Sequence, residues 1–167
     1  RESLADQKAL GDELGMGYHI HISETKREVD ECKEEYGMSP VVFFDELGML
    51  SETTIAAHTV WIDDKDIDIL AKRKVNCVFN PASNMKLASG FMPLRKLRDK
   101  GVNVCLGTDG ASSNNKQDMF REMFLGAMIQ KGNSLNPVEV TAREMLRMAT
   151  INGAHALGMD KEIGSIE

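Results

Sequence analysis

The chain has 167 residues, of which 42% are hydrophobic and 28% charged, the length and composition of about one ordinary globular domain. This excludes a collagen, a disordered tail and a peptide hormone. Lys and Arg together number 20 against 26 Asp and Glu, a net charge of -6 that disfavours a nucleic-acid partner. The longest apolar runs, such as 102–106, are far shorter than the roughly 20 residues of a membrane span, and no leader opens the chain. We expect a cytoplasmic protein with no membrane partner.

The three cysteines, Cys32, Cys77 and Cys105, are an odd number and include no Cys-x-x-Cys pair. A disulfide framework and a thiolate zinc site are therefore both disfavoured, as in a reducing compartment. Cys77 and Cys105 lie in short apolar segments, which favours buried packing over a role as nucleophile.

The first half of the chain alternates between helical and strand patterns. Leucines at helical spacing predict a helix over 3–14, which Gly15 ends, and a strand over 18–23 follows. The charged stretch 26–36 predicts a second helix, whose acidic side chains we interpret as a solvated face. These acidic residues are Glu28, Asp30, Glu31, Glu34 and Glu35. A third helix over 40–47, with Ser39 as N-cap and Pro40 at its first position, leads to a strand over 53–58.

The same alternation continues to the end of the chain. A helix over 64–72 leads to a strand over 76–79, and a helix over 93–100 leads to a strand over 102–106. Two more helices follow, at 118–130 and at 138–157, with a break expected near Asn152 and Gly153.

Short apolar strands separated by helices are typical of a parallel sheet buried on both faces, so the predicted class is α/β. No strand is followed by Gly-x-Gly-x-x-Gly or by a phosphate-binding loop, which disfavours nucleotide binding of those kinds. Instead, ionisable or polar residues follow each strand, and they begin at His21, His58, Asn80 and Asp109. Polar side chains at the carboxyl ends of successive parallel strands are typical of the active site of a (β/α)8 barrel.

His19 and His21 alternate along one strand, so both imidazoles lie on the same face. His21 is nearer the strand end and is the better candidate for a metal ligand, whereas His19 is more simply a hydrogen-bonded core histidine. Glu24 lies just past this strand, where its carboxylate would project over the mouth of the expected active site. A helix N-terminus would also favour Glu24, but a carboxylate beside a metal is what hydrolytic acid–base chemistry needs.

Asp109 follows a strand that is apolar after Asn103. Asp-Gly alone indicates a turn, but a carboxylate at the end of a buried strand needs a cation or metal to offset its desolvation. His58 closes another strand and could ligate a metal, polarise a bond or carry a proton. Four polar residues after Asp109 either donate to substrate or cap the helix at 118; they are Ser112, Ser113, Asn114 and Asn115. We interpret His155, on a helix far from any strand end, as structural or surface.

Four strand-end segments resemble the second half of the amidohydrolase superfamily barrel: HIHISET at 19–25, AHTVW at 57–61, NPASNMKLASG at 80–90 and GTDGASSNN at 107–115. Within that superfamily they are most similar to the 5-methylthioadenosine/S-adenosylhomocysteine deaminases and the related triazine hydrolases. The resemblance covers nearly the whole chain, with the segments in the same order.

This resemblance implies a metal-dependent hydrolytic deaminase acting on the adenine ring of such nucleosides. His21 and Asp109 would be zinc ligands, Glu24 the acid/base at the ring nitrogen, and His58 the histidine that orients the hydrolytic water. Asp109 would also pass the proton of the water to the departing ammonia. Glu24, His58 and Asp109 would contact the substrate together with Ser113. The mixed imidazole and carboxylate set suits zinc and also iron or manganese.

The His-x-His pair of the family's first barrel strand has no counterpart in this chain. We therefore interpret residues 1–167 as the C-terminal half of the barrel, strands five to eight with their helices, and 162–167 as the start of a link to a small β-domain. We expect this piece alone to bind zinc weakly or not at all, to lack deaminase activity and to form homo-oligomers through its uncovered sheet. The alternatives are a triazine hydrolase, a guanine- or cytosine-type deaminase, or a non-catalytic α/β interaction module.

Overall fold

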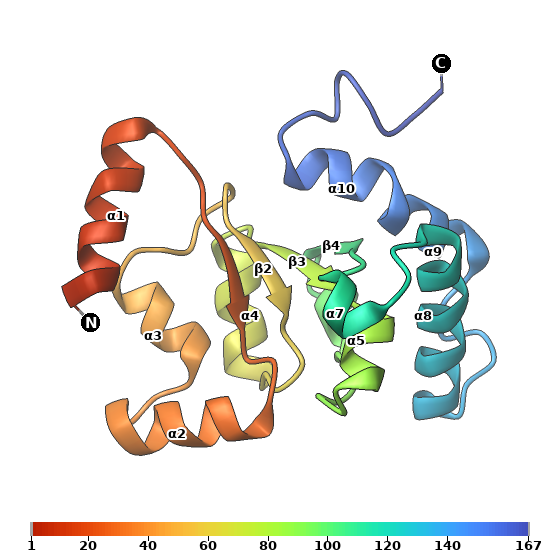
Figure 1. Ribbon diagram of the computed structural model, residues 1–167, viewed down its shortest axis with the longest axis horizontal. Helices are drawn as coiled ribbons and strands as arrows, with labels where there is room; N and C mark the ends of the chain where they lie inside the picture. Colours follow the sequence, from red (N-terminus) through yellow and green to blue (C-terminus); the bar gives the residue numbers. More distant parts are fainter. Residues whose placement is uncertain (1, 167) are drawn as a thin grey trace.

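The computed structural model describes residues 2–166, which form a four-stranded parallel sheet in the order β1-β2-β3-β4 with helices packed around it (Figure 1). The strands are β1 His19–Ile22, β2 Ile55–His58, β3 Asn76–Phe79 and β4 Asn103–Leu106. The helices are α1 Glu2–Leu14, α2 Lys26–Tyr36, α3 Pro40–Glu46, α4 Asp64–Lys72, α5 Pro81–Lys86, α6 Leu94–Asp99, α7 Ala111–Asn114, α8 Met119–Ser134, α9 Ala142–Ala149 and α10 Ile151–Ala156. The predicted α/β class and its four parallel strands are confirmed.

The pairing register aligns the strands at their carboxyl ends. Ile22 of β1 pairs with His58 of β2, and Phe79 of β3 pairs with Leu106 of β4. Segments that follow the strands therefore emerge at one edge of the sheet. This is the edge where the polar segments of the sequence were expected to gather.

One face of the sheet carries the hydrophobic core. Side chains that alternate along the strands, such as Ile22, Cys77 and Val104, pack with residues of α3, α4, α6 and α9. The other face is only partly covered by the described residues, and His19 and His21 of β1 are exposed on it. The prediction of a sheet buried on both faces is therefore wrong for β1, because its core contacts come from one side only.

Two local predictions differ from the structure. The helix expected over 138–157 is two helices, and the break falls at Thr150, whose backbone leaves the helical region, rather than at Asn152 and Gly153. The short helices α5 and α7 were not predicted, because each occupies only one or two turns directly after a strand end. N-capping by Ser39 and Pro40 at the start of α3 is confirmed.

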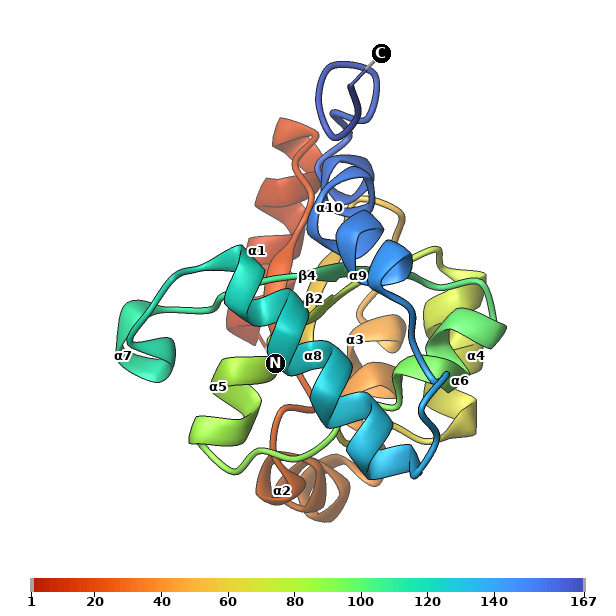
Figure 2. The same cartoon turned by 90° about the vertical axis from the view of Figure 1, so that its right-hand side faces the viewer.

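Helix α8 lies between α5 and α9 and contacts both (Figure 2). Residues 162–166 contain neither helix nor strand, and residue 167, the end of the expected link, lies outside the described residues. Among residues 2–166, no helix is long and apolar enough to cross a lipid bilayer.

Candidate metal and acid–base site

Three side chains from different strand ends meet at the carboxyl edge of the sheet. His21 lies in β1, His58 ends β2, and Asp109 follows β4. Their ligand atoms all lie within 4.8 Å of one another. Glu24, from the loop after β1, stands beside them, with its Oε2 3.8 Å from Nε2 of His58. The structure therefore brings together all four predicted residues of the catalytic and metal site.

His58 reaches this cluster through an unusual backbone conformation. By register its side chain would share the core face with Ile22, yet its ring lies 5.0 Å from the ring of His21 on the opposite face. The φ angle of His58 is 75°, a left-handed value that turns the side chain away from strand alternation. Such conformations are costly for a residue other than glycine and cluster at functional sites.

A hydrogen bond fixes the orientation of the His58 ring. Its Nδ1 donates to Oδ1 of Asn84 in α5 at 2.8 Å, and the side chain is 1% exposed. Nε2 then faces the carboxylates of Glu24 and Asp109, at 3.8 and 3.9 Å. These separations are too long for hydrogen bonds, which leaves Nε2 available to a ligand between the carboxylates.

Asp109 is held as an ionised carboxylate by its neighbours. Its Oδ2 accepts a 2.6 Å hydrogen bond from Ser83, and its Oδ1 accepts a 2.7 Å bond from the backbone N–H of Gly110. Burial opposes ionisation, but the hydrogen bonds from Ser83 and Gly110, together with the nearby Ser113 and His58 side chains, outweigh it and lower the pKa of Asp109. Asp109 also has a positive φ of 59°, which directs its side chain over the strand ends.

Glu24 is positioned by hydrogen bonds to its side chain and to its backbone. Oε1 accepts from Ser89 at 3.0 Å, and the indole N–H of Trp61 in turn donates to the Ser89 carbonyl at 2.6 Å. Glu28 accepts the backbone N–H groups of Ser23 and Glu24, each at 2.7 Å. Glu28 is thus a capping residue of α2, and its prediction as part of a solvated face is wrong.

The donor set fits a divalent metal. Two imidazole nitrogens and one carboxylate are ligands that zinc accepts, and iron and manganese accept the same types. Nε2 of His58 and Oδ2 of Asp109 are 3.9 Å apart, so both residues are close enough together to hold one divalent ion. His58 thus fits a ligand position as well as the water-orienting role that the family resemblance implies.

The other predicted residues lie elsewhere. His19 is exposed and does not belong to the cluster, and His155 is a surface residue that forms an ion pair with Asp160 at 3.6 Å. Ser113 is half-buried, and its hydroxyl donates to the Gly110 carbonyl at 3.0 Å. Asp118 is the N-cap of α8, so none of the four polar residues before it serves as that cap.

Three positioning residues of the site were not predicted individually, namely Ser83, Asn84 and Ser89. All three lie in the segment after β3, which sequence reasoning had marked only as a polar strand end. The sequence signal available for these three residues was their position in a polar segment after a strand. Their partners could not be found without the fold, because each bonds to a residue at least 26 positions away.

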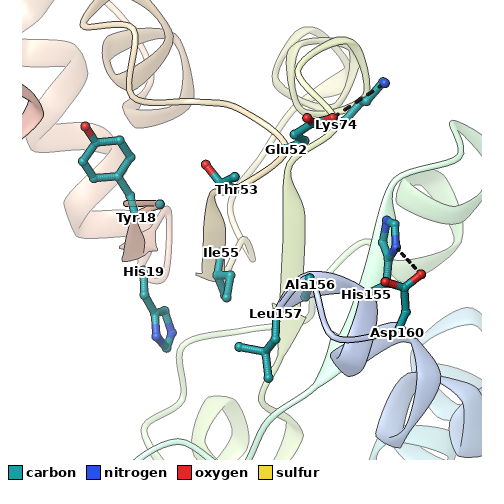
Figure 3. A pocket seen from close by; sticks show the side chains of 12 residues that line it. Tyr18, His19, Glu52, Thr53, Ile55, Lys74, His155, Ala156, Leu157 and Asp160 are labelled. Carbon is teal, nitrogen blue, oxygen red and sulfur yellow. Dashed lines mark ion pairs between the residues drawn. The ribbon is translucent and has the colours of Figure 1, made fainter. Parts of the chain in front are cut away.

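A cavity of about 680 Å³ lies at the opposite end of the sheet, where β1 and β2 begin and α10 ends (Figure 3). Its charged side chains pair among themselves, His155 with Asp160 and Lys74 with Glu52. Catalytic groups of (β/α) barrels gather at the carboxyl ends of the strands, so we place the candidate site there and not in this cavity.

A parallel sheet with imidazole and carboxylate donors at its carboxyl edge is typical of a metal-dependent barrel hydrolase. The chain belongs to the amidohydrolase family, whose family model matches residues 2–167.

The chain is 50% identical over 159 residues to a 5'-deoxyadenosine deaminase of Methanothermobacter thermautotrophicus, covering 95% of this chain and 37% of the relative. It is 56% identical over 149 residues to a 5-methylthioadenosine/S-adenosylhomocysteine deaminase of Thermococcus sibiricus, covering 89% and 35%. An adenosine deaminase of Xanthomonas campestris with bound zinc superposes with a TM-score of 0.93 at 40% identity, over 98% of this chain and 37% of that one. The chain thus spans little more than a third of the length of these proteins.

Proposed function

We propose that this chain is the C-terminal half of the catalytic barrel of a metal-dependent deaminase that acts on the adenine ring of 5'-deoxyadenosine-type or 5-methylthioadenosine-type nucleosides. The main support is the convergence of His21, His58, Asp109 and Glu24 at one edge of the sheet. The names of relatives at 50% and 56% identity support the substrate class.

We propose that His21 and Asp109, with Nε2 of His58 beside them, hold the metal, most simply zinc. A divalent metal held there would activate the attacking water and lower the pKa of that water to about 7. A weak base such as the Asp109 carboxylate is then sufficient to accept the proton of the water. Asp109 passes this proton to the amino group as it leaves as ammonia.

Glu24 completes the proton balance on the ring. In its acid form it donates a proton to the ring nitrogen adjacent to carbon 6, which makes that carbon electrophilic. It then recovers a proton from the new hydroxyl group as the carbonyl of the product forms. Because Ser89 donates to Oε1, the proton that Glu24 transfers belongs on Oε2, the oxygen that faces His58. Ser113 is the proposed further contact to substrate.

The direct test is ammonia release by the full-length protein that carries this chain, loaded with zinc. We expect rapid release from 5'-deoxyadenosine or 5-methylthioadenosine, and release at least 100-fold slower from guanine and from an amino-substituted triazine. Faster release from guanine or from the triazine would assign the chain to another substrate class of the same family. No release from any of the four compounds would contradict the proposed function.

The isolated chain of 167 residues provides a comparison with the full-length protein. We propose that the isolated chain does not deaminate and binds zinc weakly, because it lacks the His-x-His pair of the family's first barrel strand and its described cluster lies on an open face. Equilibrium dialysis should find less than one tightly bound zinc per chain. Stoichiometric tight zinc, or ammonia release by the isolated chain, would show that the site is already complete.

A further inference from the structure

Helix α8 places polar side chains at its fully buried positions, which is unusual for an amphipathic helix. Glu122, Gly126 and Gln130 are its buried residues, and they follow one another at four-residue spacing on one side. Three large apolar side chains of the same helix are instead exposed: Phe120, Phe124 and Met128. A buried polar stripe of this kind needs specific partners, because an unpaired carboxylate in the interior is strongly destabilising.

Glu122 has such partners, and they belong to two different loops of the site. The side chain is fully buried, and Oε2 accepts the backbone N–H of Ala82, at the start of α5, at 3.0 Å. Oε1 accepts from Nδ2 of Asn114, at the end of α7, at 2.9 Å. The same Nδ2 also donates to the carbonyl of Thr108 at 2.6 Å. Both carboxylate oxygens are therefore used to join the segment after β3 to the segment after β4.

The two joined segments carry the hydrogen bonds that orient the site. The residues immediately after Ala82 are Ser83, which donates to Asp109, and Asn84, which accepts from His58. Asp109 itself directly follows Thr108. The Ala82 end of the Glu122 bridge is thus one residue from Ser83 and two from Asn84. The Asn114 end is tied to the residue before Asp109 by its bond to the Thr108 carbonyl.

Close packing of α8 keeps this bridge short. Gly126, one turn after Glu122, lies against the end of β3, and a Cβ there would stand 3.1 Å from Cε1 of Phe79 and 3.5 Å from Cγ of Pro81. A larger side chain at this position would push α8 away from α5. The glycine therefore allows the carboxylate of Glu122 to reach the backbone of Ala82.

We propose that Glu122 is a positioning residue of the metal site, which sets the separation of Asp109 and His58 by joining their supporting loops through Ala82 and Asn114. The proposal rests on the proposed function, because it concerns the same site. It goes beyond that function in assigning a role to a buried carboxylate whose hydrogen-bond partners, Ala82 and Asn114, are not the proposed metal ligands.

The test replaces Glu122 by Gln in the full-length protein. Both partners of Glu122 are N–H donors, so the introduced amide can accept from only one of them and opposes the other with its own NH2 group. Gln130→Leu is the matched control. It lies two turns further along the same buried face and removes one buried hydrogen bond, from Nε2 to the Met92 carbonyl at 3.0 Å, away from the site.

Two measurements report on positioning separately from stability. Zinc affinity is measured on the folded protein by competition with a chelator, and amide hydrogen exchange of Ala82 is measured without metal. For Glu122→Gln we expect zinc binding about 10- to 100-fold weaker, the usual effect of a lost supporting contact, and faster exchange at Ala82. Gln130→Leu should lower the melting temperature and leave zinc affinity within about twofold of wild type.

The outcomes separate this inference from the proposed function. Wild-type zinc affinity in Glu122→Gln, or an equal loss in Gln130→Leu, would overturn the positioning role and leave the deaminase proposal intact. A wild-type protein that binds no zinc would overturn both. If Glu122→Gln fails to fold, Asn114→Ala removes the other end of the bridge and must show the same loss of zinc affinity for the inference to stand.

Discussion

Nδ1 of His58 and Oδ1 of Asn84 lie 2.8 Å apart, and this one hydrogen bond determines which nitrogen of the buried histidine faces the site. An amide oxygen can only accept, so Nδ1 donates this bond and Nε2 is the nitrogen that points to Glu24 and Asp109. A partner of this kind on the far nitrogen is the usual way in which proteins fix a metal-binding or proton-carrying histidine.

Replacing Asn84 by Leu should therefore weaken the site without removing any of its ligands. The ring of His58 loses its acceptor and can rotate or change tautomer, and we expect zinc affinity in the full-length protein to fall about 10- to 100-fold. Asn84→Asp keeps an acceptor at the same position and should retain most of the affinity. Equal losses in the two variants would show that the hydrogen bond does not orient His58.

The buried thiols should be chemically inert in the folded chain. Burial raises the pKa of Cys77 to about 12 and that of Cys105 to about 11. At pH 8 their thiolate fractions are then on the order of one in a thousand or less. A thiol-reactive dye should label at most one cysteine, Cys32, in the native chain and three after unfolding. Cys32→Ser should abolish native labelling, and rapid labelling in that variant would contradict the buried positions.

The capping box of α9 should contribute stability that depends on pH. Glu144 accepts from the backbone N–H and the hydroxyl of Thr141 and pairs with Arg98 at 2.7 Å. Burial opposes ionisation, but these contacts outweigh it and lower the pKa of Glu144. The contribution is therefore complete above the unfolded-state pKa, about 4.3, and is lost as the pH falls through the lower folded-state value.

In urea unfolding at pH 7, Glu144→Gln should lower the free energy of unfolding by less than about 1 kcal/mol, because the side chain is partly exposed to solvent. The difference from wild type should shrink as the pH falls below about 4, where the carboxyl of Glu144 becomes protonated. A difference that grows with acidity would contradict the assigned sign.

The partly covered sheet and its unpaired edges should make the isolated chain self-associate. β1 and β4 are the edge strands of the described sheet, and His19 and His21 lie exposed on its open face. Unpaired strand edges are templates for pairing with another chain. Sedimentation equilibrium should detect dimers or larger species at concentrations above about 10 µM. A monomer throughout that range would show that these edges are protected.

The fold was largely predictable because its strands are short, apolar and bounded by helices with strong end signals. Ser39 before Pro40 and the glycine after α2 are local signals that need no tertiary information. The short helices α5 and α7 gave no periodic signal. The break at Thr150 was misplaced because Asn152 and Gly153 are the more obvious helix breakers in the sequence, whereas they lie inside α10.

The reactive side chains of the site could be predicted from the sequence, whereas the residues that position them could not. His21, Glu24, His58 and Asp109 each follow or end a strand, and parallel topology alone brings such residues to one edge. Glu122 carried no comparable signal, because it lies inside a helix and its partners, Ala82 and Asn114, are set by how α8 packs. The left-handed conformation of His58 was equally invisible, since nothing in the residue type requires it.

We propose that Asp109 serves both in holding the metal and in transferring the proton. Asp109→Asn in the full-length protein should reduce ammonia release from 5'-deoxyadenosine by several orders of magnitude and remove most of the bound zinc. Asp64→Asn, which breaks only the exposed pair with Lys96, is the control and should leave both unchanged. The decisive measurement is the ammonia release rate of Asp109→Asn at saturating zinc. A rate near background is the predicted result, and a rate within tenfold of wild type would contradict the account.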